Sequence, residues 1–518
     1  MKRSIQIAWP REMDADIAVI GSGAGGAVVA KELAELGYNV VIIEEGRYFT
    51  REDFNLNPLE SILKMYRQAG QSLAIGTPLF LLPLGCTVGG TTTINSGTCL
   101  RMPRRVLKRW QLSYGLTDID ETEMDLLYKA VEEFLFVKRA DPETAGKNAQ
   151  IFLEAAQKMG LSGGWLPRNA KDCEGFGVCA FGCPSDAKQS MNVSYIPAAL
   201  AAGATLLSRC RAERIIINKD GCATGVSAIA LDPSPAEIKI HARIVVLAAG
   251  AIYSPYLLLK QKIGNSSGQV GLNLHIHPCV STIAELDRRL DNPKGIPQSS
   301  YIDEFAADGI MLEGGTMPPG IHAMNLLLSG RKHRLHMNSY PYTGIFGGMI
   351  SETGSGGTVT VSPLLKDRPL VRYRFRGADL NKAKFAVSLM AQIWFAAGAR
   401  KVYTPIAGFS EITGARQLAD LERARLKPSD FDALTAYHPM GTCRMGADAK
   451  YSVVKSSCES WDVERLYIVD GSIIPTSLGV NPQLTIMALA MRAAGIIDER
   501  LQGEARRKLN KPEGRGQT

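Results

Sequence analysis

His438 stands in a segment whose residue types could support proton transfer. Residues 436–446 read AYHPMGTCRMG, with the histidine among Pro, Gly, Cys and Met. A histidine titrates near neutral pH, so its ring can accept a proton when an O–H bond breaks. A histidine in such a setting is also commonly a packed, hydrogen-bonded loop residue. This segment alone leaves both interpretations open.

Three cysteines form a second group that could do chemistry. Cys173, Cys179 and Cys183 lie in the glycine-rich segment KDCEGFGVCAFGCPSDAKQS, and Pro184 follows the third cysteine. Iron–sulfur clusters are held by thiolates in loops of this kind, often with a Pro after the last ligand. The alternative is a set of reduced thiols or one local disulfide. We therefore treat the three cysteines as candidate iron–sulfur ligands and keep the alternative open.

Residues 16–46 have the pattern of a dinucleotide site. They read DIAVIGSGAGGAVVAKELAELGYNVVIIEEG, a short apolar strand followed by Gly21, Gly23 and Gly26, a helical pattern and a second strand. This spacing allows a tight turn, close approach of a pyrophosphate to the backbone, and close packing of the helix on the strand. The first turn of the helix offers unpaired N–H groups to the phosphates. Glu44, at the end of the second strand, is placed to accept hydrogen bonds from ribose hydroxyls.

The glycine pattern does not distinguish NAD from FAD. No second such unit follows a strand elsewhere in the chain, which fits either cofactor bound alone. An NAD-dependent dehydrogenase and a non-catalytic subunit that binds flavin structurally both remain alternatives.

Further segments decide between these cofactors. Along the chain they read GCTVGGTTTINSGTCLR (85–101), VVLAAGAIYSPYLLLKQKIG (245–264), VGLNLHIHP (270–278), AYHPMGTCRMG (436–446) and LYIVDGSIIPTSLGVNPQLTIMALAMRAAGII (466–497). In this order they resemble the glucose–methanol–choline (GMC) oxidoreductase family over nearly the whole chain. The resemblance implies FAD as the cofactor and oxidation of a CH–OH donor.

The resemblance also implies which residues bind FAD. The Gly/Thr loop should lie along the flavin and pyrophosphate, while Pro482 and Thr485 should lie beside the isoalloxazine. Some relatives attach FAD to a histidine at the position that Ile94 occupies here, so we expect noncovalent FAD. The expected cofactor-binding residues are Gly21, Ser22, Gly23, Ala24, Gly25, Gly26, Glu44, Glu45, Gly89, Gly90, Thr91, Thr92, Asn95, Gly97, Thr98, Ala249, Gly250, Asp470, Gly471, Pro482 and Thr485.

His438 and Asn481 are the catalytic residues that the resemblance implies. His438 would take the hydroxyl proton, Asn481 would hydrogen-bond the substrate's oxygen, and the flavin would take the hydride. The segment VNPQLTIMALAMR also predicts a helix with Asn481 as its N-cap and Pro482 in its first turn. The other histidines receive structural interpretations: His275 and His277 as packing residues, and His333 and His336 in a solvated loop.

The substrate implied by the resemblance is an alcohol, polyol or sugar. We expect the electrons to pass to an acceptor other than oxygen, either a protein or a quinone. The alternatives are an oxygen-dependent alcohol oxidase and an FAD-containing lyase of the hydroxynitrile lyase type. The cysteine spacing resembles that of GMC sugar dehydrogenases with a three-iron cluster. It also resembles the CxxCGxCxxGC segment of long-chain alcohol oxidases, with Phe176 in place of the second Cys.

The chain has 518 residues, which is too long for one hydrophobic core. The elements that position these groups should therefore form more than one domain. We expect an α/β fold: an FAD-binding Rossmann-like domain with an α+β substrate-binding cap built on an antiparallel sheet. Strands at 357–363 and 369–375 and a helix at 381–399 belong to the cap. The FAD-binding domain should be discontinuous (13–130, 190–300 and 435–500), the cap should comprise 131–189 and 301–434, and 501–518 should form a basic tail.

The composition excludes several classes of protein. The net charge of +8 arises largely from local basic segments, and no motif for binding DNA or RNA is present. The start of the chain lacks the apolar region of a secretory signal, and the longest apolar stretch, 244–259, is too short to cross a bilayer. Ten cysteines without a signal favour thiols or metal ligands over disulfides. We expect a cytoplasmic protein without a transmembrane segment, with peripheral binding to a membrane surface as an alternative.

Overall fold

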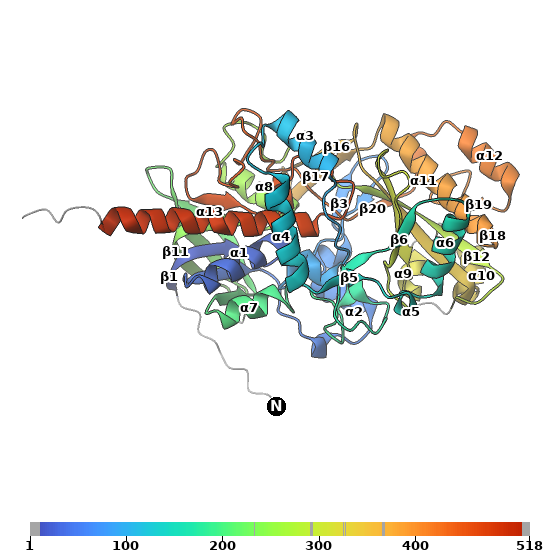
Figure 1. Cartoon of the computed structure of the whole chain (residues 1–518), viewed down its shortest axis with the longest axis horizontal. Coiled ribbons are helices and arrows are strands. Elements are labelled where there is room, and N and C mark those ends of the chain that lie inside the picture. Colours follow the sequence, from blue (N-terminus) through green and yellow to red (C-terminus); the bar gives the residue numbers. More distant parts are fainter. Residues whose placement is uncertain are drawn as a thin grey trace, which may run out of the picture.

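Two β-sheets together position the residues of the candidate site. The computed structural model describes residues 11–232, 234–290, 294–324, 326, 328–364 and 368–509. In Figure 1, the smaller sheet with α1 and α13 lies at one end of the molecule, and the larger sheet with α11 lies at the other.

The smaller sheet is a parallel sheet extended by an antiparallel hairpin. Its order is β8-β2-β1-β11-β10-β9, with β21 pairing with β11 as well. The strands β8, β2, β1, β11 and β21 run parallel, whereas β10 runs antiparallel to both of its neighbours, β11 and β9. The bounds are β1 (Glu12–Ile20), β2 (Val40–Glu44), β8 (Thr205–Ser208), β9 (Cys210–Ile217), β10 (Ala223–Ala230), β11 (Ala236–Leu247) and β21 (Leu466–Ile468).

The central strands are apolar because helices cover them. Every residue of β2 is buried, as expected for a parallel strand with both faces covered. The helix α1 (Ala24–Glu35) contacts both α7 (Tyr195–Ala201) and the long C-terminal α13 (Gln483–Leu509). The predicted strand–turn–helix–strand unit at 16–46 is therefore confirmed as β1–α1–β2.

The larger sheet contains the strands expected for the cap and is called the cap sheet below. Its order is β16-β17-β3-β4-β20-β12-β15-β14-β13-β6, with β18 and β19 attached beside β12. The bounds are β16 (Gly356–Val361), β17 (Pro369–Arg374), β3 (Leu73–Ile75), β4 (Phe80–Leu81), β20 (Leu434–Ala436), β12 (Pro278–Leu286), β15 (Thr343–Ile350), β14 (Ile310–Gly315), β13 (Ser300–Ile302), β6 (Gly163–Trp165), β18 (Ala399–Tyr403) and β19 (Glu411–Ile412). The expected strands at 357–363 and 369–375 form as β16 and β17, and the expected helix at 381–399 forms as α11 (Gly377–Ala396). The helix packs on β12 and β15 of the same sheet.

The remaining elements connect or cover the sheets. They are α2 (Pro58–Met65), α3 (Arg104–Tyr114), α4 (Glu121–Phe134), α5 (Pro142–Ala145), α6 (Lys147–Lys158), α8 (Gly250–Gln261), α9 (Pro319–Met324), α10 (Gly330–Asn338) and α12 (Ala415–Arg423), with a separate pair of strands β5 (Val137–Arg139) and β7 (Pro167–Asn169). None of the described helices is both long and apolar enough to cross a membrane.

Three strands pair outside the part of the chain in which they were expected, and the domain boundaries themselves stay a prediction. The strands β3, β4 and β12 lie in ranges expected for the FAD-binding domain, yet they pair within the larger sheet. The basic tail begins as the last turns of α13, and residues 510–518 lie outside the described residues.

The solvated loop predicted around His333 and His336 is wrong. These residues belong to α10, and His336 is buried against His322, with 3.0 Å between their Nε2 atoms. The basic residues that suggested a loop lie on the same helix and leave His336 on its buried side. Charge along the sequence did not reveal which face packs.

Candidate active site

One large cavity joins the glycine turn to the His438 segment. Its volume is about 1680 Å³, and its lining includes residues 20–25, 90–92, 94–98, 248–253, Asn481 and His438. A pocket for one drug-sized ligand measures about 300–1,000 Å³. The cavity can therefore hold a dinucleotide together with a substrate.

The glycine turn fits the phosphates of a dinucleotide. Gly21 has a φ of +99°, and a Cβ on Gly25 would stand 1.8 Å from the carbonyl oxygen of Val469. Both positions therefore require glycine for the fold itself. A Cβ on Gly23, by contrast, would meet no atom within 4 Å. That open space at the N-terminus of α1 is where a pyrophosphate would approach the backbone.

Glu44 holds this turn in place through hydrogen bonds, and it also lines the cavity. Its Oε2 accepts hydrogen bonds from the backbone N–H of Ser22 at 3.1 Å and from the Ser22 hydroxyl at 2.7 Å, and its Oε1 accepts from the N–H of Gly46 at 2.7 Å. Burial raises the pKa of Glu44, and these hydrogen bonds oppose the rise. A carboxylate has about four acceptor positions, so ribose hydroxyls can still bind. Glu45 pairs with Arg67 at 2.7 Å beside it.

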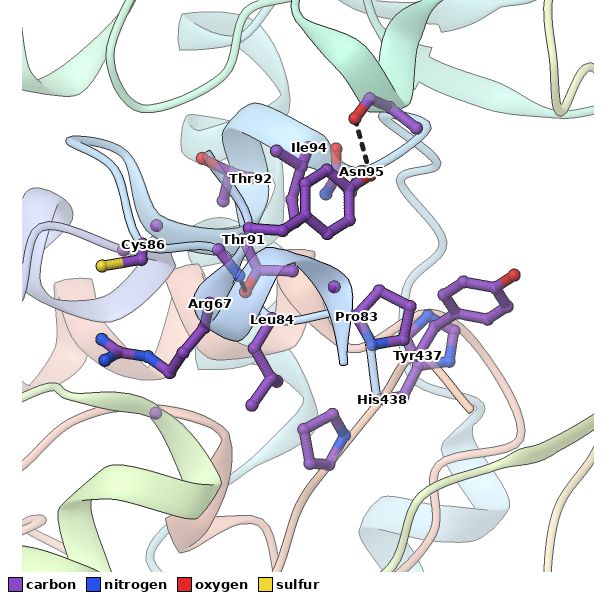
Figure 2. A pocket seen from close by; sticks show the side chains of 18 of the residues that line it. Arg67, Pro83, Leu84, Cys86, Thr91, Thr92, Ile94, Asn95, Tyr437 and His438 are labelled. Carbon is purple, nitrogen blue, oxygen red and sulfur yellow. Dashed lines mark hydrogen bonds between the residues drawn. The ribbon is translucent and has the colours of Figure 1, made fainter. Parts of the chain in front are cut away.

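The Gly/Thr loop forms the next wall of the cavity. Residues Gly90–Ile94 make a 3-10 turn, and Gly89 before it donates its N–H to the Ser22 hydroxyl at 3.0 Å. Figure 2 shows Thr91, Thr92, Ile94 and Asn95 on this wall, with Tyr437 and His438 on another part of the lining. Asn95 donates to Gln483 Oε1 at 2.8 Å, which ties the loop to the start of α13.

Asp470 holds a third part of the lining together. Its Oδ2 accepts from the N–H of Gly250 at 2.8 Å and from the Ser254 hydroxyl at 2.5 Å, and its Oδ1 accepts from the N–H of Ser472 at 2.8 Å. Burial raises the pKa of Asp470 against these bonds. Asp470 therefore joins the end of β21 to the N-terminus of α8 at the cavity wall.

Most of the residues expected to bind FAD line the cavity, and three do not: Gly26, Gly89 and Thr485. Gly26 packs on the turn, because its Cβ would stand 2.0 Å from the Gly21 oxygen. Thr485 is fully buried, and its hydroxyl lies 3.0 Å from that of Tyr128. The structure thus places Thr485 in the packing of α13 against α4, outside the cavity lining.

His438 and Asn481 lie side by side, as the family resemblance implies. The Nε2 atom of His438 lies 3.3 Å from Nδ2 of Asn481, whose Nδ2 also lies 3.4 Å from Oε2 of Glu313. Oδ1 of Asn481 is buried and has no hydrogen-bond partner among the described residues. The prediction that the Asn481 side chain caps α13 is therefore wrong, because the side chain turns toward His438 instead.

His277 is a site residue that sequence reasoning assigned only to packing. Its Nδ1 lies 3.1 Å from Nδ1 of His438, and its Nε2 accepts the backbone N–H of Gly479 at 3.2 Å. The two histidine segments meet because His275 pairs with Met440 in an antiparallel bridge. Nothing in the spacing of LHIHP indicates this pairing, which arises from the tertiary fold.

Glu352 supports both histidine segments from behind. It is buried, accepts from the N–H of Ile276 at 2.6 Å and from the Ser477 hydroxyl at 3.0 Å, and lies 3.6 Å from His275. Burial raises the pKa of Glu352, but its interactions with the neighbouring His275 outweigh burial and lower the pKa to about 2. Glu352 is thus an anion that anchors the segments of His277 and Gly479 to each other.

The backbone of Gly479 determines where the histidine protons lie. An amide N–H can only donate, so Nε2 of His277 carries a lone pair, and neutral His277 carries its proton on Nδ1. That proton points at Nδ1 of His438, so neutral His438 carries its proton on Nε2. Burial lowers the pKa of His277 to about 4 and that of His438 well below its usual value, so both rings are neutral near pH 7.

Two hydrogen-bond donors therefore face each other at the end of the cavity. One is the Nε2–H of His438, and the other is the amide of Asn481, with 3.3 Å between the two nitrogens. Neither can accept from the other in this orientation. An oxygen atom with two lone pairs can accept from both, as an alcohol or carbonyl oxygen does.

The three cysteines lie near one another but do not form a metal-binding group. Cys179 Sγ accepts from Arg168 at 3.3 Å, and Cys183 Sγ lies 3.6 Å from the Ser185 hydroxyl. Among the described residues, no group of three or more His, Cys, Asp or Glu side chains is placed to hold a metal ion. The iron–sulfur interpretation of Cys173, Cys179 and Cys183 therefore receives no support, and all ten cysteines are free thiols.

The cysteine segment instead supports the Gly/Thr loop. Lys188, which follows the third cysteine, is fully buried and donates to the carbonyl oxygens of Thr93, Asn95 and Cys179 at 2.7–2.8 Å. Burial lowers the pKa of Lys188 to about 8. The ammonium links the two segments through its three donors.

Comparison with known proteins shows which families and relatives this chain resembles. Two family models, both described as GMC oxidoreductase, match residues 62–279 and 353–490. An uncharacterised GMC-type oxidoreductase of Mycobacterium tuberculosis is 36% identical over 487 residues, which cover 94% of this chain and 76% of the relative. A long-chain-alcohol oxidase of Arabidopsis thaliana is 26% identical over 92% of this chain and 66% of its own length.

A solved structure shares the fold. Pyridoxine 4-oxidase from Mesorbium loti superposes with a TM-score of 0.71 at 17% identity, covering 94% of this chain and 99% of that one.

Gly23 and Gly25 give a matched pair of tests for the dinucleotide turn. We expect Gly25→Ala to destabilise the FAD-free protein by about 1–3 kcal/mol, because its methyl group meets the Val469 carbonyl. Gly23→Ala should keep the stability of the FAD-free protein and weaken FAD binding about tenfold or more, because its methyl group enters the space for the pyrophosphate. Urea unfolding and FAD titration measure the two effects. Wild-type FAD affinity in Gly23→Ala would contradict this assignment.

The tautomer of His438 can be measured directly. We expect ¹⁵N NMR of the histidine rings to show His438 protonated on Nε2 and bare on Nδ1, because His277 donates to Nδ1. His277→Phe should shift part of His438 to the other tautomer, whereas His241→Phe, at an exposed position of β11, should not. A wild-type His438 protonated on Nδ1 would refute the proton order described here.

Proposed function

Because this chain belongs to the GMC oxidoreductase family, we propose that it oxidises the CH–OH group of an alcohol with noncovalently bound FAD. The observation that carries the proposal is the pair of donors, His438 Nε2 and Asn481 Nδ2, placed 3.3 Å apart in a cavity large enough for a dinucleotide. Such a pair suits the oxygen of an alcohol that becomes a carbonyl.

Particular residues of the chain suit particular parts of the cofactor. The open space at Gly23 suits the pyrophosphate, and Glu44 suits the ribose. Ile94 stands where covalently flavinylated relatives carry a histidine, which supports noncovalent binding. The flavin, when bound, supplies the acceptor for the hydride.

His438 and Asn481 hold the substrate's oxygen. Both donors would point at it, and the bonds strengthen as negative charge develops on the oxygen during oxidation. The sequence-based hypothesis made His438 the base. The hydrogen bond from Gly479 places the ring protons on His277 Nδ1 and His438 Nε2, and burial lowers the pKa of His438. Both favour a different role, in which neutral His438 donates from Nε2. His438 stays a catalytic residue in this proposal, and it stabilises the oxygen.

The substrate class is an alcohol, with sugars and polyols included. One of the similar proteins is named as an oxidase of long-chain alcohols, which supports the alcohol and leaves its size open. We propose that an acceptor other than oxygen, a quinone or a protein, receives the electrons.

Anaerobic mixing with a panel of primary alcohols, polyols and sugars tests the proposal. At least one should bleach the visible absorbance of the bound flavin, because the hydride reduces it. His438→Ala should slow this bleaching about 10²–10³-fold, the usual cost of losing one such donor. His241→Ala, on the exposed side of β11, should leave it unchanged. The proposal fails if no alcohol bleaches the wild-type protein, or if His438→Ala reacts at the wild-type rate.

Re-oxidation of the bleached protein identifies the acceptor. We expect a soluble quinone to restore the flavin absorbance faster than dissolved oxygen at equal concentration. Faster re-oxidation by oxygen, with release of hydrogen peroxide, would instead make the protein an oxidase.

A further inference from the structure

The cap sheet turns one face toward α11 and the other toward the cavity. On β15, a Cβ at Gly348 would stand 3.0 Å from the Cβ of Ala386 on α11. Side chains alternate along a strand, so Gly347 and Met349 face the opposite way, and both line the cavity. Gly347 is partly exposed, whereas the other residues of β15 are buried. The cavity therefore meets bare backbone at this point of the sheet.

Gly347 lies close to the pair of donors. A Cβ at Gly347 would stand 3.4 Å from both the Sγ of Cys279 and the carbonyl oxygen of Glu313. Cys279 follows His277 by two residues on the same segment. The side chain of Glu313 reaches Asn481, with 3.4 Å between its Oε2 and Nδ2 of the amide. The bare backbone thus adjoins the two strands that lead to the donors.

The fold does not require glycine at position 347. The backbone of Gly347 lies outside the left-handed region, and 3.4 Å is an ordinary contact distance for a methyl group. Gly315, on the same cavity wall, differs, because a Cβ there would stand 2.4 Å from the carbonyl oxygen of Ile296. The lack of a side chain at Gly347 therefore leaves space in the cavity that a bound molecule can fill.

The wall around this space offers few polar partners. Among the described residues, those that line the cavity from β12 and β15 carry no charge, and Ser281 supplies their one hydroxyl. Burial raises the pKa of Cys279 to about 12, so this side chain is a neutral thiol, and Met349 adds a thioether. The carboxyl of Glu313 is bonded to Gln298, and its other oxygen is buried. A sugar carries a hydroxyl on nearly every carbon, and each one costs free energy when it is buried without a partner.

The same wall continues to apolar side chains at α9. From Met349 to Ile345 the strand rises about 13 Å. Ile345 belongs to a buried apolar cluster on this face of the sheet. Ile321 and Met324, three residues apart on α9, line the cavity, and Met324 is 76% exposed. The cavity thus runs from the donors over Gly347 to an apolar end.

We propose that Gly347 determines substrate specificity, because the carbon chain of a linear alcohol passes over it from the donor pair to α9. This inference rests on the proposed alcohol oxidation and narrows its substrate to apolar alcohols. An extended chain of about ten carbons spans the length of this wall. Its oxygen lies between His438 and Asn481, and its methylene groups contact Gly347 and Cys279. Each methylene that is fully buried favours binding by a factor of about three to four.

Anaerobic bleaching of the FAD-bound protein by a series of linear alcohols tests the inference. The second-order rate constant of the wild type should rise about threefold per methylene from ethanol toward decan-1-ol, because each methylene becomes buried. Gly347→Leu fills the space, so the ratio of the rate constants for decan-1-ol and ethanol should fall about 10²-fold, and Gly347→Ala should lower it less. The matched control is Gly356→Leu on β16, outside the cavity lining, where a Cβ would meet only the carbonyl oxygen of Leu274 at 3.8 Å. This control should keep the wild-type ratio.

A binding measurement needs no oxidation. Acetamide and decanamide share a carbonyl oxygen that can accept from His438 and Asn481, and only decanamide has the long chain. In calorimetric titrations of the FAD-bound wild type, decanamide should bind about tenfold more tightly than acetamide, or better still. Gly347→Leu should lose most of this difference. FAD content shows whether each variant has folded, and Gly347→Ala carries both comparisons if Gly347→Leu has not.

The outcomes separate the inference from the proposed function. If sugars or polyols bleach the flavin faster than every linear alcohol, or if Gly347→Leu keeps the wild-type ratio, the inference is overturned and the alcohol oxidation stands. If no alcohol bleaches the flavin, the proposed function fails. The amide titration then decides alone whether an apolar chain lies over Gly347, and equal binding of decanamide by wild type and Gly347→Leu would overturn the inference as well.

Discussion

The hydrogen bond from the Gly479 amide to His277 is the interaction on which the active-site account depends. A backbone N–H cannot reverse its role, so it sets the proton on His277 and, through the contact of the two Nδ1 atoms, the proton on His438. With the protons placed in this way, His438 donates a hydrogen bond from Nε2 at the cavity wall. The surrounding structure keeps the order in place, because the buried Glu352 anion ties the segments of Ile276 and Ser477 together.

The two sheets bring separate halves of the chemistry to one cavity. The β1–α1–β2 unit presents a turn with open space for phosphates, and Asp470 and the Gly/Thr loop extend that wall. The cap sheet contributes Glu313 from β14, and His277 and His438 from the segments beside β12 and β20. Asn481 enters from the start of α13 and stands between Glu313 and His438. The site thus lies at the junction of the sheets, where each half is held by regular structure.

The sequence sufficed for the parts of the molecule that obey local rules. The βαβ unit follows from its glycines and apolar strands, and β16, β17 and α11 follow from their periodicity. The pairing of His438 with Asn481 came from the family resemblance. Sequence reasoning did not identify His277 and Glu313 as residues of the cavity wall, because their positions depend on contacts between distant segments. The lone acid in the apolar strand IMLEGG was the one available signal for Glu313. Thr485 and the cysteines show the converse, since motif position suggested contacts that packing does not make.

Neutron diffraction from crystals of the protein with FAD and a slowly reacting alcohol tests the central claim most directly, because it locates the exchangeable hydrogens. The account predicts deuterium on His277 Nδ1 and on His438 Nε2, with the alcohol oxygen between His438 and Asn481. Deuterium on Nδ1 of His438, with a bare Nε2 facing the alcohol's hydroxyl, would contradict the account.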